Sequence, residues 1–139
     1  MLDASVVVAL ALEEEVGAVA KRLILGLLTA GSRSCVPSFF DAECAHALLR
    51  AARRGRLSAA HAAERLFDIL VLPLDRSSSA ATVLDGILLA QAHGLSAYDA
   101  VYVALSDETG LPLVTADARL VRALEGTSHA VLLLEETAF

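Results

Sequence analysis

Apolar residues recur at helical spacing over most of the chain, and short continuous apolar runs separate these stretches. The helical periodicity, together with the glycines and capping residues around it, predicts helices over residues 5–16, 17–29, 38–54, 58–70, 77–93, 96–109 and 117–124. The short runs predict strands over 34–37, 71–74, 112–115 and 130–134, and Met1–Leu2 resembles the end of a further strand. This alternation predicts a three-layer α/β/α domain with a mostly parallel sheet.

Polar residues at the predicted helix starts set the expected boundaries. Asp3 and Ser5 are suited to cap the first helix, although Val6–Val8 within it also favour a strand. Ser38, with Asp41 three residues later, resembles a capping box and places the start of the third helix at Ser38. Several strands are therefore followed closely by helix starts, at the sheet edge where α/β proteins bind their ligands.

A length of 139 residues is usual for one domain, so we expect a single domain over residues 1–139. The longest apolar runs, at 6–12 and 130–134, are too short to cross a bilayer. No basic stretch precedes an apolar segment as it does in a secretory leader. The two cysteines have neither zinc-site nor disulfide spacing. We therefore expect a cytoplasmic protein that does not associate with membranes.

The formal net charge of −6 argues against nucleic-acid binding driven by a broadly basic surface. A local basic cluster could still hold a polyanion, and one cluster is present: Arg50, Arg53, Arg54 and Arg56. The cluster follows a predicted helix, so the alternative is a solvated helix end whose cations complement the helix dipole.

Two aspartates follow predicted strands. Asp3 follows Met1–Leu2, and Asp117 follows the strand at 112–115. Each also precedes a predicted helix, so N-capping alone would explain either residue. Because the carboxyl ends of parallel strands meet at one edge of a sheet, we expect both carboxylates to lie at that edge.

Two further acids lie in the first two turns of helices that begin at the same edge. Asp99 lies three residues after Ser96, so a capping box would explain it. Apolar residues surround Asp99, however, and we expect the start of this helix to be buried nearly all round, where a carboxylate needs a partner. Glu43 lies in an apolar stretch between Phe39 and Ala45, where an exposed helix face is the alternative.

Four carboxylates at one edge of a sheet would repel one another and raise one another's pKa unless cations lay between them. Mg²⁺ binds through a few carboxylates together with water and phosphate oxygens. Two such ions can stabilise both the attacking and the leaving oxygen of a phosphodiester displacement. The sequence therefore predicts metal-dependent cleavage of a phosphodiester.

Three segments carry a resemblance to a known family: LDASVVVAL at Leu2–Leu10, SAYDAVYVAL at Ser96–Leu105 and LVTADARL at Leu113–Leu120. Together with Glu43 they resemble prokaryotic PIN domains, most of all the VapC-type toxins of toxin–antitoxin pairs. The resemblance covers essentially the whole chain. It implies a five-stranded parallel sheet and an endoribonuclease that uses one or two Mg²⁺ or Mn²⁺ ions. It further implies an RNA substrate, a cognate antitoxin and a homodimer.

The resemblance also implies roles for individual residues. The metal ligands would be Asp3, Glu43, Asp99 and Asp117. Thr115 matches a hydroxyl residue near the metal site, and Ser5 matches a small hydroxyl residue that would support the first aspartate. Backbone capping would also explain both hydroxyls. His46 stands three residues after Glu43, where the family often carries asparagine.

Other functions are compatible with an α/β domain of this size. A dehalogenase-like phosphatase needs a second aspartate where Ser5 stands, and a receiver domain needs a lysine after its last strand, whereas the only lysine is Lys21. A non-catalytic PIN-like binding module is a further alternative. An incomplete set of the four acids would support it, but the set is complete. Within the nuclease class, a toxin and a housekeeping RNA-processing enzyme both remain open.

Overall fold

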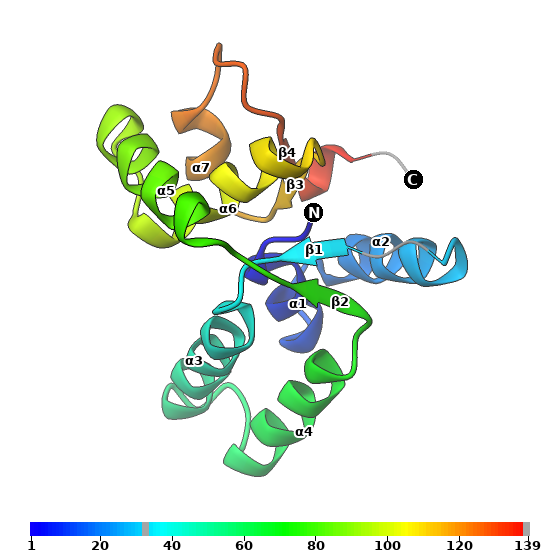
Figure 1. The fold of residues 1–139 in the computed structure, drawn as a ribbon. Helices are drawn as coiled ribbons and strands as arrows, with labels where there is room; N and C mark the ends of the chain where they lie inside the picture. The colour runs from blue at the N-terminus through cyan, green and yellow to red at the C-terminus, as the bar shows by residue number, and fades with distance from the viewer. Residues whose placement is uncertain (32–33, 138–139) are drawn as a thin grey trace.

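The computed structural model describes residues 1–31 and 34–137 and shows short parallel strands surrounded by helices (Figure 1). The helices are α1 Ala4–Ala11, α2 Gly17–Thr29, α3 Phe40–Arg53, α4 Ala59–Leu70, α5 Ala80–His93, α6 Ala97–Thr109 and α7 Ala118–Ala123. The strands are β1 Ser34–Val36, β2 Leu74–Arg76, β3 Leu113–Thr115 and β4 Val131–Leu133, and a 3₁₀ turn follows at Leu134–Glu136. The α/β class expected from the sequence is confirmed.

The strands pair in parallel, β1 with β2 and β3 with β4. The N-terminal segment adds to β3: the Asp3 amide donates to the Val114 carbonyl at 2.9 Å, and the Val114 amide donates to the Met1 carbonyl at 3.0 Å. Within the described residues the ladders thus form two separate groups, and a continuous five-stranded sheet is not confirmed. Pairing with β3 places Asp3 beside the end of that strand.

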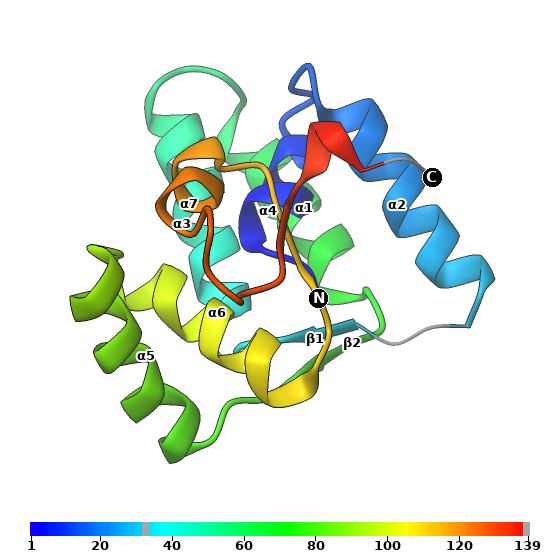
Figure 2. The same cartoon turned by 90° about the horizontal axis from the view of Figure 1, so that it is seen from above.

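Helix α1 lies at the centre of the fold and contacts α2, α3, α4 and β3. The α3–α4 pair lies at one end of the molecule and α5, α6 and α7 at the other, with β1 and β2 between them (Figure 1). The N-terminus lies next to β3 in the middle of the molecule, where the Met1 ammonium donates to the Pro112 carbonyl at 2.8 Å (Figure 2). Among the described residues, none of the helices has the length and apolar character needed to cross a membrane.

The central position of α1 explains why its sequence also favoured a strand. Residues Val6–Ala9 are all buried, so this helix is apolar nearly all round. The helix ends at Ala11, earlier than the expected Val16, because the chain leaves helical geometry at Glu13. Glu13 pairs with Arg65 at 2.8 Å, and its φ of 53° turns the chain toward α2.

Gly17 allows α2 to pack closely against α1. A Cβ atom at this position would lie 2.9 Å from the Ala9 carbonyl oxygen, which is closer than a side chain tolerates. The sequence placed the boundaries of α2 correctly at Gly17–Thr29, because this glycine follows a polar break in the pattern.

Three other elements begin two or more residues away from the sequence prediction. Helix α3 begins at Phe40 without a side-chain cap, and the Ser38 hydroxyl instead bonds the Ser78 hydroxyl at 2.8 Å. The expected capping box at Ser38 is therefore wrong. Helix α5 begins after Ser79, which forms a capping box with Thr82, rather than at residue 77.

The strand expected at 71–74 lies at Leu74–Arg76 instead. Val71 ends α4, and Pro73 lacks the amide that a ladder needs. Arg76 then fixes the strand in place, because its guanidinium donates to the Leu74 carbonyl at 3.1 Å and pairs with Asp41 at 2.7 Å. The Arg76–Asp41 pair joins residues 35 positions apart, which local hydrophobic periodicity does not encode.

Candidate active site

Asp3 is buried at the end of the N-terminal segment, with 6% of its surface exposed. One carboxylate oxygen accepts the Ser5 amide at 2.8 Å, and the other accepts the Thr115 hydroxyl at 2.7 Å. Burial raises the pKa of Asp3, and the negative charge of Asp99 raises it further. Asp3 is thus a helix cap, as its position allowed, and also a buried carboxylate in the field of a second acid.

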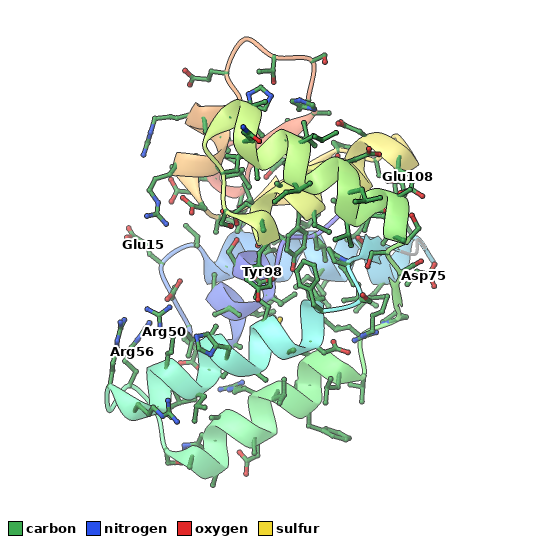
Figure 3. The ribbon with its side chains drawn as sticks, turned by 60° about the vertical axis from the view of Figure 1, so that its left-hand side comes forward. Glu15, Arg50, Arg56, Asp75, Tyr98 and Glu108 are labelled. Atoms are coloured by element: carbon green, nitrogen blue, oxygen red, sulfur yellow. The ribbon has the colours of Figure 1, made fainter. Side chains whose placement is uncertain are left out.

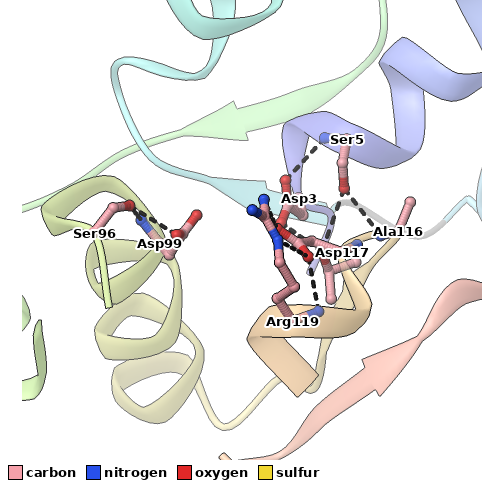
Figure 4. A network of polar contacts seen from close by, with 8 residues as sticks. Asp3, Ser5, Ser96, Asp99, Ala116, Asp117 and Arg119 are labelled. Carbon is pink, nitrogen blue, oxygen red and sulfur yellow. Dashed lines mark hydrogen bonds and ion pairs between the residues drawn. The ribbon is translucent and has the colours of Figure 1, made fainter. Parts of the chain in front are cut away.

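Two hydroxyl groups connect the start of α1 to the loop after β3 (Figure 4). The Ser5 hydroxyl accepts the Ala116 amide at 2.9 Å and lies 3.3 Å from the Thr115 hydroxyl. The Thr115 oxygen accepts the Asp117 amide at 3.0 Å. Both hydroxyls therefore cap backbone groups, and the same bonds fix Asp3 relative to the loop that carries Asp117.

Glu43 lies in the first turn of α3 and is partly buried, which argues against the fully exposed helix face. Its carboxylate accepts a 2.7 Å hydrogen bond from the hydroxyl of Tyr102. Burial raises the pKa of Glu43, and the charges of Asp3 and Asp99 contribute to the increase. The three acids Asp3, Glu43 and Asp99 therefore lie close enough to influence one another.

Asp99 lies in the first turn of α6 and accepts the Ser96 hydroxyl at 2.7 Å, while its own amide donates to the Ser96 oxygen at 3.1 Å. The expected burial of this turn on all sides is wrong, because Ala97 and Tyr98 are exposed. From Ala100 to Ser106 the helix is buried throughout. Asp99 thus lies where α6 emerges from the core, which leaves its carboxylate accessible from outside.

Asp117 caps α7 and differs from the other acids because its partner is a cation. Its Oδ1 accepts the Arg119 amide at 2.8 Å and Nε at 3.2 Å, and its Oδ2 accepts Nη2 at 3.0 Å. Hydrogen bonds from the Arg119 side chain lower the pKa of Asp117. Figure 4 shows the Arg119 guanidinium over Asp117, on the side that faces Asp3.

Carboxylate oxygens are the ligands that Mg²⁺ and Mn²⁺ prefer, so the four side chains fit these ions chemically. Burial is the main cause of the raised pKa of Asp3 and of Glu43, and the neighbouring negative charges add to it, so a cation at the site would relieve part of the cost of ionising both acids. In the part of the chain that the structure describes, however, no three Asp, Glu, His or Cys side chains are close enough to hold one ion. Metal binding would therefore require the side chains to move together.

Sequence reasoning missed two residues that contact the expected ligands. Tyr102 was not singled out in the sequence; it is 1% exposed, and its hydroxyl orients Glu43. Its spacing of three residues from Asp99 places both on one face of α6, which is the signal that could have identified it. Arg119 resembled an ordinary surface residue of a short helix. His46, which stands where the family often carries asparagine, is exposed.

A groove of about 580 Å³ lies away from these acids, between α1, α2 and α4. Its floor is apolar and includes Val7, Ile24 and Ile69, and charged side chains such as Lys21 and Arg65 line its rim. None of the four carboxylates lines this groove. Asp3 is buried, whereas Glu43, Asp99 and Asp117 are each partly exposed.

A buried aspartate beside a parallel strand, with further acids at the starts of neighbouring helices, defines a class of α/β proteins with an acidic site at the carboxyl edge of the sheet. A family model described as PIN domain matches residues 1–125, and the chain belongs to the PIN-domain family.

Individual relatives agree with this assignment. The chain is 35% identical over 104 residues to Ribonuclease VapC1 of Mycobacterium tuberculosis, which covers 75% of this chain and 77% of the relative. It is 41% identical over 93 residues to Ribonuclease VapC9 of the same organism, covering 67% and 72%. The crystal structure of PAE2754 from Pyrobaculum aerophilum superposes with a TM-score of 0.71 at 26% identity, covering 96% of this chain and 89% of the other.

Proposed function

We propose that the protein is an endoribonuclease that depends on Mg²⁺ or Mn²⁺ and acts as the toxin of a toxin–antitoxin pair. The observation that carries the proposal is the network in which the Thr115 hydroxyl bonds both the Asp3 carboxylate and the Asp117 amide. Glu43 and Asp99 lie close enough for their charges to act with that of Asp3. Relatives at 35–41% identity are named as VapC ribonucleases, which supports RNA as the substrate. A non-catalytic module would have no need to retain a costly cluster of carboxylates.

The four carboxylates of Asp3, Glu43, Asp99 and Asp117 would hold one or two ions. A bound ion would supply positive charge to the phosphate oxygens during the displacement. The protein's own hydrogen bonds orient the ligands: Thr115 and Ser5 hold Asp3, and Tyr102 holds Glu43. These bonds orient each acid before an ion binds, and the side chains would then have to move together around the ion.

The broader organisation is also a proposal. We propose one PIN-like domain over residues 1–139, in which Met1–Asp3 also joins β1 to give a five-stranded sheet. The exposed apolar side chains Val83, Leu84, Ile87 and Leu88 along α5 support a homodimer, since single proteins rarely leave such a row uncovered. The free cysteines support a cytoplasmic location.

The purified protein should cleave single-stranded RNA in Mn²⁺ or Mg²⁺ and lose this activity when EDTA is added. Re-addition of excess Mn²⁺ should restore the activity, which controls for damage by the chelator. A broad panel of RNAs should be used, because nothing in the fold defines the cleavage sequence. Cleavage that persists in EDTA, or no cleavage of any RNA with Mn²⁺, would contradict the proposal.

We propose that the basic cluster Arg50, Arg53, Arg54 and Arg56 helps to hold RNA. Figure 3 shows Arg50 and Arg56 close together at one side of the molecule. Arg56 pairs with Glu14 at 3.0 Å, which fits the alternative of a solvated helix end. Arg53 and Arg54 are exposed at the end of α3 and are the two positions to test.

Replacing Arg53 and Arg54 with alanine should weaken RNA binding and reduce its salt dependence. The slope of log K against log salt should fall by about 0.7 for each lost phosphate contact on a single strand. Binding is measured without divalent metal, so that the RNA stays intact. Lys21→Ala with Arg22→Ala removes the same charge from α2 and serves as the control. Equal slopes in the two double variants would favour the alternative, in which the cluster is a solvated helix end that does not hold RNA.

A further inference from the structure

Arg119 contacts both carboxylate oxygens of Asp117 through three donors. Its side-chain Nε and Nη2 each bond one oxygen, at 3.2 and 3.0 Å, and its amide adds a bond of 2.8 Å to Oδ1. A guanidinium matches the geometry of a carboxylate in this way, with two parallel N–H donors. The oxygens that would bind a metal are therefore already in contact with a positive charge from the same chain.

The pairing is notable because the Arg119 side chain is 85% exposed and is free to extend into water. The other acids of the site accept hydrogen bonds from neutral groups: Asp3 from Thr115 and Glu43 from Tyr102. Within residues 1–31 and 34–137, no other Lys or Arg side chain forms an ion pair with any of the four acids. The positive charge of Arg119 also acts on Asp99, across the site from Asp117.

We propose that Arg119 is an internal counter-ion of the acidic site, which occupies Asp117 in the metal-free protein and must release it before a metal can bind. The proposal rests on the proposed function, since it assumes that Asp117 is a metal ligand. Arg119 and the metal then compete for the same oxygens. The competition lowers metal affinity. The Arg119 contact also holds Asp117 in one orientation while no metal is bound.

The expected effect is modest, because exposed ion pairs are screened by water. Removing such a pair should tighten Mn²⁺ binding by about two- to fivefold. The loss of any nearby positive charge would also favour a cation, so a control for net charge is necessary. Arg122 provides it, because it is an exposed arginine on the same short helix α7.

The test is isothermal titration of Mn²⁺ into the wild-type protein and into Arg119→Gln, Arg119→Lys and Arg122→Gln, without RNA. Arg119→Gln should bind Mn²⁺ more tightly than Arg122→Gln, and Arg119→Lys should lie between Arg119→Gln and wild type, because lysine keeps the charge but lacks the paired donors. Thermal melting of each variant checks that the fold is kept.

Equal Mn²⁺ affinity in Arg119→Gln and Arg122→Gln would overturn the counter-ion proposal but would not contradict the proposed metal site. Weaker binding in Arg119→Gln would also overturn it, and would make Arg119 a support for Asp117 rather than a competitor. No Mn²⁺ binding by any variant would instead refute the proposed metal site and the counter-ion with it. The two failures are therefore distinguishable in one series of titrations.

Discussion

Replacing Asp3 with asparagine should reduce RNA cleavage by at least about 100-fold while the protein remains folded. Mutation of a residue that hydrogen-bonds a metal ligand typically reduces activity or metal affinity by about 10- to 100-fold. Mutation of the ligand itself should therefore reduce activity by about 100-fold or more. Asparagine keeps the shape, and its oxygen can still accept the Ser5 amide. Its amide group can donate to the Thr115 hydroxyl, which accepts as readily as it donates.

The same substitution should stabilise the metal-free protein at neutral pH. Burial raises the pKa of Asp3 above its value in the unfolded chain, so the ionised carboxylate destabilises the fold. This penalty is fully present above the raised pKa and is absent below the unfolded value of about 4. The melting temperature of the variant should therefore exceed that of wild type at pH 7, and the difference should shrink toward pH 4.

Asp85→Asn is the matched control, because Asp85 is exposed on α5, away from the acids. It should change neither RNA cleavage nor the melting temperature at pH 7 appreciably. An Asp3→Asn protein that unfolds would show that the carboxylate is a structural cap rather than a metal ligand. A folded Asp3→Asn protein with full activity would remove Asp3 from the catalytic site.

Expression of the wild-type chain alone in a bacterial host should arrest growth, and co-expression of the adjacent upstream gene should restore it. An active cytoplasmic ribonuclease degrades RNA that its host needs, so the toxin function requires an inhibitor. The acidic site can bind a guanidinium, since Asp117 already accepts one from Arg119. An antitoxin segment could insert an arginine among the acids in the same way.

Asp99→Asn provides the control for this growth experiment, because it removes one charge from the site and should be harmless when expressed. Equal toxicity of the Asp99→Asn variant would assign the growth defect to aggregation or burden rather than to RNA cleavage. Harmless expression of a soluble wild-type protein that cleaves RNA in vitro would count against the toxin role. It would favour a housekeeping RNA-processing nuclease.

The sequence predicted the location of the acids better than it predicted the sheet. Asp3 and Asp117 follow parallel strands, and strand polarity alone brings such positions to one edge. The strand after α4 was misplaced, and its Arg76 pairs with Asp41, 35 positions away. The first helix was predicted too long, and Glu13, which leaves helical geometry with a φ of 53°, pairs with Arg65, 52 positions away. Such pairings depend on the tertiary fold, which a local window of sequence cannot report.

The partners of the acids were less predictable than the acids themselves. Tyr102 fits the apolar periodicity of α6, so its hydroxyl was not considered separately from the core. Arg119 looks like any solvated cation, and only the side-chain geometry shows that it covers Asp117. The positions of the acids after strands and at helix starts could be predicted from the sequence, whereas the hydrogen bonds that orient them required coordinates.

The hydrogen bond between Thr115 and Asp3 joins residues that are 112 positions apart in the chain. A ribosome must therefore synthesise most of this protein before the site can assemble. The Met1–Asp3 segment has no β3 to pair with until residues 113–115 have left the exit tunnel. A nascent chain that is still being translated lacks the completed acidic site, so the messenger RNA and the ribosome that produce it are not exposed to a finished nuclease until synthesis is nearly over.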